Sequence, residues 1–553
     1  MKTALLSVYN KDGIVEFAKE LVALDFKIYA SGGTAKILSA AGIEVTDIAS
    51  LVGGGPILGH RVVTLSREIH AGLLAQDNDD DRNELKKLNI PWIDLVCIDL
   101  YPLQSAIEEV KSEQLKVESA REKVIEKTDM GGPAALRSAA KGRRIVVCDP
   151  ADRLRVVDWL KNGEPEKDTF LNDLAAKAEF TVANYALASA RYHSKGKYDG
   201  IILSESLECK YGENAWQTPA KLLVGDHSPL SLSEFKLTAG TAPSYNNLAD
   251  VDRLLQTMTH LAAGLDVNNI DLSPNPSPAP GEGNPKRYIA IGVKHGNPCG
   301  AAVDDNPHRV LQKMLEGDLR AIFGGLVMVN FTVDEVAAEI LLSYQMPENQ
   351  RRLLDGIIAP EFSAAAVEML KRKGDKCRFL VNPALASLSK SSLDEHFRFR
   401  YVRGGFLMQP NYNFVLDLKN SELEASGELS DAQKQDIILA WAVGSTSNSN
   451  TVSIAKDGQL IGNGVGQQDR VSVCELAIKR ATDAKHDVSG AVAYSDSFFP
   501  FPDGPQKLID AGIKTIFATR GSVKDEEVKK VCMDNGVSFI TLPDTAARGF
   551  FNH

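Results

Sequence analysis

An alternation of short apolar runs and amphipathic segments at the N-terminus constrains the fold of this chain most strongly. Ala4–Val8 predicts a buried strand, and the segment from about Asp12 to Leu24, which Asn10 can cap, predicts a helix with one apolar face. A second strand is expected at Phe26–Tyr29, and a second helix at about Ala35–Ala41. The order strand, helix, strand, glycine-rich turn, helix indicates an α/β fold with a doubly wound parallel sheet.

The glycine-rich turn in this pattern is Ser31-Gly32-Gly33-Thr34, at the start of the second helix. Free main-chain N–H groups and hydroxyls at a helix start suit a phosphate group, although an ordinary tight turn explains the same residues. Asp94–Leu100 predicts a further central strand, and Thr128–Lys141 predicts a helix that follows an Asp-Met-Gly-Gly opening. The N-terminal region is therefore a candidate anion-binding domain.

The chain has 553 residues, which is too many for one hydrophobic core. A helical, Ala-rich segment at Phe170–Arg191 is followed by a polar connector at His193–Gly200. We place the domain boundary near residues 195–205, with an N-terminal domain at 1–200 and a second region at 201–553. No internal repeat in the sequence is strong enough to claim.

The composition excludes several classes of protein. The formal net charge of −11 argues against nucleic-acid binding, which needs a basic surface. The seven cysteines are scattered without a C-x-x-C pair, which indicates a reducing compartment and argues against structural zinc. No apolar run approaches the roughly 20 residues of a membrane span, and the N-terminus turns polar too early for a signal peptide. The sequence predicts a cytoplasmic protein without a membrane partner and without metal-ligand residues.

The segment Ile291–Val303 carries the most suggestive chemistry. Arg287–Val293 predicts a short buried strand that ends at Lys294 and His295, before a turn of Gly296, Asn297 and Pro298. Histidine transfers protons near neutral pH, and lysine stabilises developing negative charge. The alternative is a surface cation next to a capping histidine.

Motifs over nearly the whole length resemble the bifunctional purine-biosynthesis family that combines an AICAR transformylase with an IMP cyclohydrolase. The first part carries LLSVYNKDG, ASGGTAK, LGHRVVTL, IDLYPL and TDMGGPAALRSAAK, which are similar to the cyclohydrolase half. The second part carries KYGENAWQTPA, SYNNLADVD, VKHGNPCGAA, IFGGLVMVN, LDGIIAP, TSNSNTVSIAKDG, GNGVGQQDR and SDSFFPFPD, which are similar to the transformylase half. The resemblance implies a methylglyoxal-synthase-like N-terminal domain and an α/β transformylase region of cytidine-deaminase-like subdomains.

The resemblance also implies two consecutive reactions. A formyl group moves from 10-formyltetrahydrofolate to the 5-amino group of AICAR, and formyl-AICAR then closes its ring and loses water to give IMP. His295 is expected to take the amine proton, with Lys294 as stabiliser and proton donor and Asn450 orienting the formyl oxygen. The remaining positions that resemble AICAR or folate contacts are Lys210, Tyr211, Asn247, Phe323, Asp355, Arg470, Phe498, Pro500 and Arg548.

For ring closure, the resemblance assigns catalytic positions to Tyr101, Asp129 and Lys141. It assigns nucleotide-binding positions to Lys11, Ser31, Gly32, Gly33, Thr34 and Arg61. The sequence departs from the family at Val63, which replaces the lysine that the resemblance assigns a central role in ring closure. The departure matters because valine cannot stabilise an oxyanion or transfer a proton. Either the cyclohydrolase is slow, or Lys141, His60 or Arg67 substitutes, or this half only binds nucleotide.

Two more departures lie in the transformylase half, where Lys210 replaces an arginine and Trp216 replaces a histidine. Lys210 keeps the charge but loses bidentate phosphate recognition. The resemblance further implies a homodimer with transformylase sites assembled from both chains, and a structural potassium ion.

Overall fold

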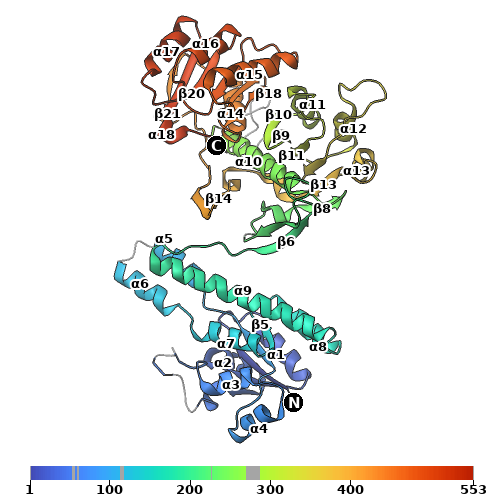
Figure 1. Cartoon of the computed structure of the whole chain (residues 1–553), viewed down its shortest axis with the longest axis vertical. Coiled ribbons are helices and arrows are strands. Elements are labelled where there is room, and N and C mark those ends of the chain that lie inside the picture. Colours follow the sequence, from blue (N-terminus) through green and yellow to red (C-terminus); the bar gives the residue numbers. More distant parts are fainter. Residues whose placement is uncertain are drawn as a thin grey trace, which may run out of the picture. The chain divides into compact units, whose positions relative to one another are not determined.

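The computed structural model describes residues 2–52, 57–58, 62–112, 117–225, 227–268 and 287–551. It divides into two compact units, Met1–Ile202 and Leu203–His553, called unit 1 and unit 2 below (Figure 1).

Unit 1 is built on a five-stranded sheet in the order β3-β2-β1-β4-β5. The strands are β1 (Lys2–Ser7), β2 (Phe26–Ala30), β3 (Val45–Asp47), β4 (Leu95–Ile98) and β5 (Ile145–Val147). Every neighbouring pair is parallel. The predicted doubly wound parallel sheet is therefore confirmed. In such a sheet ligands bind beyond the carboxyl ends of the strands, where the strand order reverses.

Helices connect these strands. They are α1 (Ile14–Ala23), α2 (Gly32–Ala40), α3 (Arg67–Leu74), α4 (Asp79–Lys87), α5 (Leu103–Ser112), α6 (Val117–Glu126), α7 (Gly131–Lys141), α8 (Asp152–Lys161) and α9 (Lys167–Ser194), with a short 3₁₀ turn at Ile48–Ser50. The first helix begins later than predicted, because Gly13 stands before it in a left-handed conformation (φ 67°) and Asn10 accepts the Asp12 N–H instead of capping it.

Unit 2 contains one twelve-stranded sheet in the order β16-β21-β20-β19-β17-β18-β10-β9-β11-β12-β13-β8. Its first six strands are β8 (Lys236–Ala239), β9 (Tyr288–Lys294), β10 (Asn297–Asp304), β11 (Leu326–Val329), β12 (Gly356–Ala359) and β13 (Arg378–Val381). Its other six are β16 (Glu424–Ser426), β17 (Val452–Lys456), β18 (Gln459–Gly464), β19 (Val492–Ser495), β20 (Thr515–Arg520) and β21 (Ser538–Pro543). The buried strand expected at Arg287–Val293 is β9.

Helices cover both faces of this sheet (Figure 1). On one face α10 (Tyr245–Asn268) and α14 (Asp431–Ser445) pack together in a common core. The helices that share the two other cores are α11 (Pro307–Gly317), α12 (Glu335–Ser343) and α13 (Ala364–Leu370) in one, and α15 (Arg470–Asp483), α16 (Asp503–Asp510) and α17 (Asp525–Asp534) in the other. The remaining elements are α18 (Asp544–Ala547), three short 3₁₀ turns (Leu232–Glu234, Pro383–Ser387, Lys390–Ser392) and two separate hairpins, β6 (Ser204–Cys209) with β7 (Ala220–Val224) and β14 (Phe397–Val402) with β15 (Gly405–Pro410).

Unit 2 consists of two copies of one architecture. Each half runs strand, helix, antiparallel hairpin, helix, strand, helix, strand, helix, strand, from β8 to β13 and from β16 to β21. The pairings also agree, because each half has a hairpin, then an antiparallel neighbour, two parallel pairs and an antiparallel edge strand. The halves join where β10 and β18 pair antiparallel. This repeat was not predicted from the sequence, and the cytidine-deaminase-like character of the halves stays a prediction.

The hairpin turns of the two halves correspond residue by residue. Lys294-His295-Gly296 joins β9 to β10, and Lys456-Asp457-Gly458 joins β17 to β18. His295 and Gly296 have φ angles of 54° and 70°, and Asp457 and Gly458 have 55° and 73°. Both are two-residue turns with left-handed central residues, which match the twist of antiparallel strands. We refer to them as the matched turns.

The buried carboxyl of Asp436, on α14, predicts a pH-dependent stability. It accepts the main-chain N–H groups of Gly458 (2.7 Å) and Asp457 (3.0 Å), yet burial raises its pKa to about 6. The folded chain thus binds a proton at Asp436 more tightly than the unfolded chain does. This proton binding stabilises the folded chain fully below about pH 4, and the stabilisation is lost as the pH rises through 6. Between pH 4 and 7 the free energy of unfolding should fall by roughly 2–3 kcal/mol relative to D436N.

Urea unfolding of the wild type and D436N across this pH range measures the difference. D431N, on the same helix but at a 96% exposed side chain, is the control and should follow the wild type. Parallel profiles for the wild type and D436N would contradict the assignment.

Candidate active sites

The carboxyl ends of β1 and β2 in unit 1 form a polar cradle. Ser7 Oγ and Ser31 Oγ are 2.6 Å apart, and Lys11 Nζ donates to Thr34 Oγ1 at 3.2 Å. Helix α2 begins between them at Gly32, and a Cβ on Gly33 would lie 3.9 Å from Lys11 Nζ. The fold thus gathers the predicted Lys11, Ser31, Gly32, Gly33 and Thr34 around the start of a helix, where an ammonium group and main-chain N–H groups can bind a phosphate.

A second group lies after β4 and before α7. Asp129 accepts the N–H of Gly132 at 2.8 Å, and its own N–H donates to Tyr185 Oη at 2.7 Å. Burial raises the pKa of Asp129, against the main-chain N–H groups of Gly132 and Tyr101, which lower it. The ring of Tyr101 packs edge-on against Tyr9, with centroids 5.4 Å apart. The main chain of Tyr101 therefore lies beside the Asp129 carboxylate, so the fold brings these two residues into one region.

Other predicted residues of unit 1 do not join this group. Lys141 is the last residue of α7, about 15 Å along the helix axis from Gly131. Arg67 lines a separate pocket of about 430 Å³ with His70, where the His70 ring contacts Ser138 Oγ at 2.8 Å. Arg61 and His60 lie outside the described residues. Val63 packs against the hydrophobic core of unit 1, so it contributes no polar group.

In unit 2, the first matched turn presents Lys294 and His295. Lys294 Nζ donates to the carbonyl of Phe323 at 2.6 Å, which ties the turn to the segment before β11. The N–H of Asn448 donates to Asn297 Oδ1 at 3.2 Å and links the turn to the segment that carries Asn450. Lys294 and His295 also line a pocket of about 340 Å³.

The other candidates before β13 come from the segment between β6 and β7, from α10 and from the starts of β11 and β12. Tyr211 accepts the N–H of Tyr245 through its carbonyl (3.2 Å), and the ammonium of Lys210 lies 5.9 Å from the Tyr211 ring. Asn247 accepts from Ser244 at 2.9 Å, which caps α10. Phe323 lies just before β11, and Asp355 lies just before β12. The Asp355 carboxylate accepts a hydrogen bond from Arg372 at 2.7 Å. Phe323 and Asp355 therefore lie at the end of the sheet where β9 ends, because β11 begins beside the last residues of β9 and β12 begins beside the start of β11.

A pocket of about 480 Å³ in the second half gathers the remaining candidates, Asn450, Arg470, Phe498, Pro500 and Arg548. Arg470 donates to the buried carboxylate of Asp496, and the Arg548 guanidinium lies 5.7 Å from the Phe498 ring. Asn450 Nδ2 donates to the Gln467 carbonyl at 2.9 Å. We call this the guanidinium pocket. Two cations beside an aromatic wall suit a phosphorylated heteroaromatic ligand.

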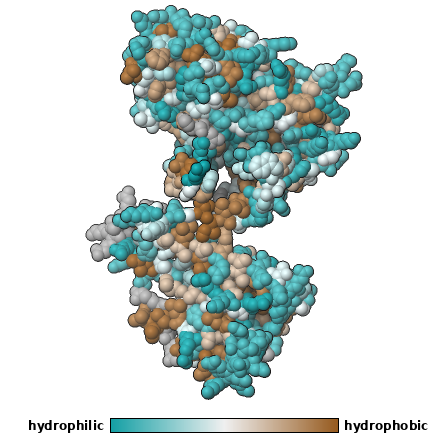
Figure 2. Space-filling view, viewed as in Figure 1, coloured by the Kyte–Doolittle hydropathy of each residue, from teal (hydrophilic) through white to brown (hydrophobic). Residues whose placement is uncertain are grey.

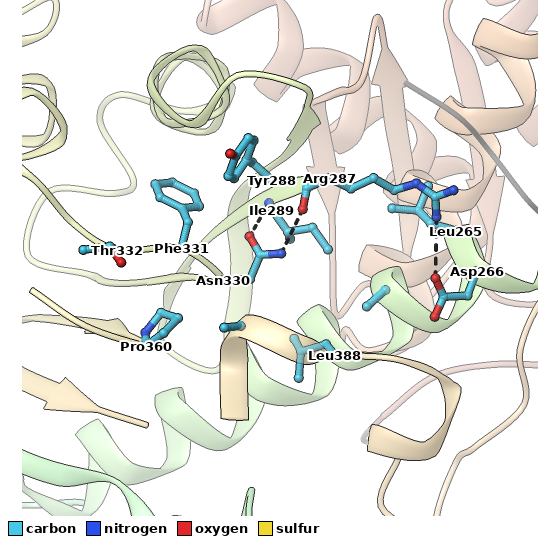
Figure 3. A pocket seen from close by; sticks show the side chains of 12 residues that line it. Leu265, Asp266, Arg287, Tyr288, Ile289, Asn330, Phe331, Thr332, Pro360 and Leu388 are labelled. Atoms are coloured by element: carbon cyan, nitrogen blue, oxygen red, sulfur yellow. Dashed lines mark hydrogen bonds and ion pairs between the residues drawn. The ribbon is translucent and has the colours of Figure 1, made fainter. Parts of the chain in front are cut away.

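The corresponding pocket of the first half has a different character (Figure 3). Asn330, the first residue after β11 as Asp496 is after β19, accepts the Ile289 N–H at 2.8 Å and donates to the Arg287 carbonyl at 2.9 Å. Arg287 forms an ion pair with Asp266 at 3.6 Å. The polar groups of this first-half pocket thus bind one another, and one arginine lines it. Two arginines line the guanidinium pocket, where Arg470 is paired with Asp496 and Arg548 with Asp544 at 2.7 Å.

Two family models match the chain. The model described as AICARFT/IMPCHase bienzyme matches residues 139–480, and the model described as MGS-like domain matches residues 13–134. The first match alone covers more than half of the chain.

The chain belongs to the AICARFT/IMPCHase bienzyme family.

Relatives of this bienzyme extend over the full length. Proteins named bifunctional purine biosynthesis protein PurH are 32% identical in Persephonella marina, over 98% of both chains, and 34% identical in Caldicellulosiruptor saccharolyticus, over 95% of both. A solved structure titled "Crystal structure of ForH" is 32% identical over 36% of this chain and 99% of that chain, with a TM-score of 0.31.

The bienzyme is accordingly an enzyme of purine biosynthesis that combines AICAR formyltransferase and IMP cyclohydrolase, and its N-terminal unit is MGS-like. Among the described residues, no helix combines the length and apolarity that crossing a bilayer requires.

Three residues of the candidate sites were not predicted from the sequence. Phe501 and Phe550 line the guanidinium pocket, and the aromatic runs around them were a signal that could have found them. Asp250 on α10 accepts the Gly296 N–H at 2.6 Å and so touches the first matched turn. No local signal in the sequence marks Asp250, because its partner is 46 positions away.

Proposed function

We propose that unit 2 transfers the formyl group and unit 1 closes the ring. One observation carries the proposal: the first matched turn offers a histidine in unit 2, whereas the second copy offers Asp457 at the same place. The duplicated architecture forms the same turn with an aspartate at that position, so folding does not require the imidazole. This supports a chemical role for His295.

In the transfer, His295 accepts a proton from the AICAR amine as its nitrogen attacks the formyl carbon of 10-formyltetrahydrofolate. The new C–N bond forms, the bond to the folate nitrogen breaks, and the folate nitrogen takes a proton. Lys294, which keeps two N–H bonds beyond the one to Phe323, is placed to stabilise the charge that develops on the formyl oxygen, and Asn450 to orient it.

We assign the substrate phosphate to Arg470 and Arg548 and the nucleotide wall to Phe498 and Pro500, because these residues share the guanidinium pocket. Lys210, Tyr211, Asn247, Phe323 and Asp355 complete the AICAR and folate contacts around the first matched turn. Trp216, at 80% exposure, carries no titratable group where the family has histidine.

For ring closure, the carboxamide nitrogen of formyl-AICAR attacks the formyl carbon, and the resulting carbinolamine loses water. We assign the phosphate to the Lys11–Thr34 cradle with Arg61, and proton transfer to Tyr101 and Asp129. Lys141 remains proposed as catalytic, although α7 places it away from them. The alternative is that unit 1 only binds nucleotide, which the packed, apolar Val63 favours.

A coupled assay that starts from AICAR and 10-formyltetrahydrofolate tests both assignments. Formyl-AICAR and IMP are followed separately by chromatography. We expect formyl-AICAR to accumulate before IMP, since ring closure lacks a charge-stabilising lysine. The absence of both formyl-AICAR and IMP would refute the transferase, and formyl-AICAR without IMP above the uncatalysed rate would leave unit 1 as a binding module.

We further propose a homodimer with shared transformylase sites. Hydrophilic side chains cover most of the visible face of unit 2, with apolar residues in patches (Figure 2). The β14–β15 hairpin, which pairs with no other strand of the described chain, exposes Phe397, Phe399, Tyr401, Val402, Phe406, Leu407 and Met408. An isolated hairpin with this much exposed apolar surface indicates a protein interface. His295 and the two arginines line separate pockets within one chain. A second copy could bring the arginines of one chain to the histidine of the other, which is why we propose shared sites.

Replacing Phe406 and Leu407 with glutamate should weaken self-association at least about 100-fold, because the interface would then bury two charges. Sedimentation velocity at micromolar concentration measures the mass, and formyl transfer should fall with the dimer. V523E, at a residue that is 98% exposed and outside the hairpin, should stay dimeric. A double variant with wild-type mass would refute this interface.

We also propose 10-formyltetrahydrofolate as co-substrate, a structural potassium ion and a cytoplasmic location. Asp496 Oδ2 is buried and has no hydrogen-bond partner in the described chain. We propose this oxygen as one ligand of a monovalent cation whose other ligands are mainly carbonyl and hydroxyl oxygens. All seven cysteines are free, as expected in a reducing compartment.

A further inference from the structure

Asp250 holds the turn that presents His295. It lies on α10, and its Oδ1 accepts the main-chain N–H of Gly296 at 2.6 Å. His295 and Gly296 both adopt left-handed backbone conformations, with φ angles of 54° and 70°. A histidine in this region is disfavoured relative to glycine, so the turn needs an outside contact to stay fixed.

A comparison of the matched turns shows which residues the turn needs in order to form and which residue differs between the two copies. In the second half, Asp436 on α14 accepts the Gly458 N–H at 2.7 Å, as Asp250 accepts that of Gly296. Lys456 Nζ donates to the carbonyl of Ser489 at 2.8 Å, as Lys294 does to that of Phe323. The lysine, the left-handed residue, the glycine and the helix carboxylate are thus common to both turns, and only the side chain at 295 and 457 differs.

We propose that Asp250 is a positioning residue for formyl transfer: by accepting the Gly296 N–H, it fixes the turn so that the His295 imidazole faces the AICAR amine. This inference rests on the proposed role of His295. Reacting groups must lie within about 3–3.5 Å of each other, and a misplacement of about 1 Å can cost about 100-fold in rate. A hydrogen bond from a helix embedded in the core supplies such a restraint.

The surroundings of Asp250 are consistent with a structural anchor. Burial raises the pKa of the Asp250 carboxyl, while the Gly296 N–H, the side chains of His295 and Arg253 through their charge, and the His295 N–H lower it. Arg253 itself is buried and donates to the carbonyl of Thr446, so it belongs to the packed interior. Asp250 therefore sits on a helix of the packed interior and holds the turn through the Gly296 N–H, and its carboxylate also lies close enough to the His295 imidazole for their charges to interact.

Steady-state kinetics of formyl transfer tests the proposal in the full-length enzyme. D250A should lower kcat about 10- to 100-fold with the KM for AICAR within about 3-fold, because substrate contacts remain while the base is misplaced. D436A removes the same contact from the other turn and should keep kcat within about 2-fold. D250N retains an acceptor oxygen and should recover most of the lost kcat.

Three results would overturn the inference. Equal losses in D250A and D436A would mean general destabilisation, and a D250N variant as slow as D250A would mean that the charge matters rather than the acceptor. A wild-type kcat in D250A would also overturn the inference. If H295A is slow in the same assay, the proposed function still stands. An undiminished H295A would instead refute the proposed function. Urea unfolding of each variant confirms that folded protein is compared.

Discussion

Replacing His295 with alanine is expected to lower the kcat of formyl transfer by about 100- to 10,000-fold, the range that a lost general base commonly costs. The amine of AICAR is a poor nucleophile because its lone pair is delocalised into the imidazole ring, so attack needs concerted removal of its proton. The appearance of tetrahydrofolate together with formyl-AICAR measures the reaction. The KM for AICAR should change little, since the assigned phosphate contacts are Arg470 and Arg548.

The internal duplication supplies a matched control for H295A. D457A changes the same position of the second turn and tests the structural cost of removing a side chain from a left-handed residue (φ 55°). D457A should transfer formyl groups within about 2-fold of the wild-type rate, and ring closure should be unaffected in both variants because it is assigned to unit 1. Comparable losses in D457A and H295A would mean that the turn, and not the imidazole, is what the reaction needs.

Local pattern was sufficient for much of unit 1. The apolar spacing of the first helix predicted its buried face, and Ile14, Phe17, Ala18 and Leu21 are indeed buried. The parallel sheet also followed from strand–helix alternation, because that connectivity allows few other arrangements. Helix starts were less accurate, since Gly13 in a left-handed conformation delays α1 to Ile14.

The duplication of unit 2 could not be predicted from the sequence. The two halves share element order and strand pairing, which are set by backbone hydrogen bonds, but they differ in the residues that line each pocket. The turns read Lys-His-Gly-Asn and Lys-Asp-Gly-Gln, and Asn330 stands where the other half has Asp496. Only the paired geometry of β9 with β10 and of β17 with β18 makes the correspondence visible.

The sites show the same limit. The resemblance to the family named Asn450, Arg470, Phe498 and Arg548 from four separate segments, and the fold places them in one pocket. The helix predicted at Thr128–Lys141 already separates Lys141 from Asp129, because each helical residue adds about 1.5 Å of axial distance, and the structure places Lys141 at the last position of α7.

Replacing Val63 with lysine is expected to raise the kcat of ring closure by about 10- to 1,000-fold. The carbinolamine step develops negative charge on oxygen, and restoring one charge-stabilising group commonly gives a factor near the upper end of this range. The rest of the site favours a gain, since the Lys11–Thr34 cradle is formed and Tyr101 and Asp129 lie together. IMP formation from purified formyl-AICAR measures the step without the transferase.

V63M controls for side-chain length, because methionine is unbranched like lysine but carries no charge. Val63 packs against the core of unit 1, so both variants lose similar packing, and their unfolding midpoints should fall together. A gain in V63K and none in V63M would assign the effect to the ammonium group.

The absolute rates then decide between the two functions of unit 1. Measurable IMP formation by the wild type that V63K accelerates means a cyclohydrolase weakened at one position. If V63K binds IMP but closes the ring no faster than V63M, the pocket lacks more than the lysine, and the packed Val63 marks a unit that binds nucleotide without turning it over. A fast wild type would require another cation at the site. Lys141, His60, Arg67 and Arg61 would then be tested by substitution.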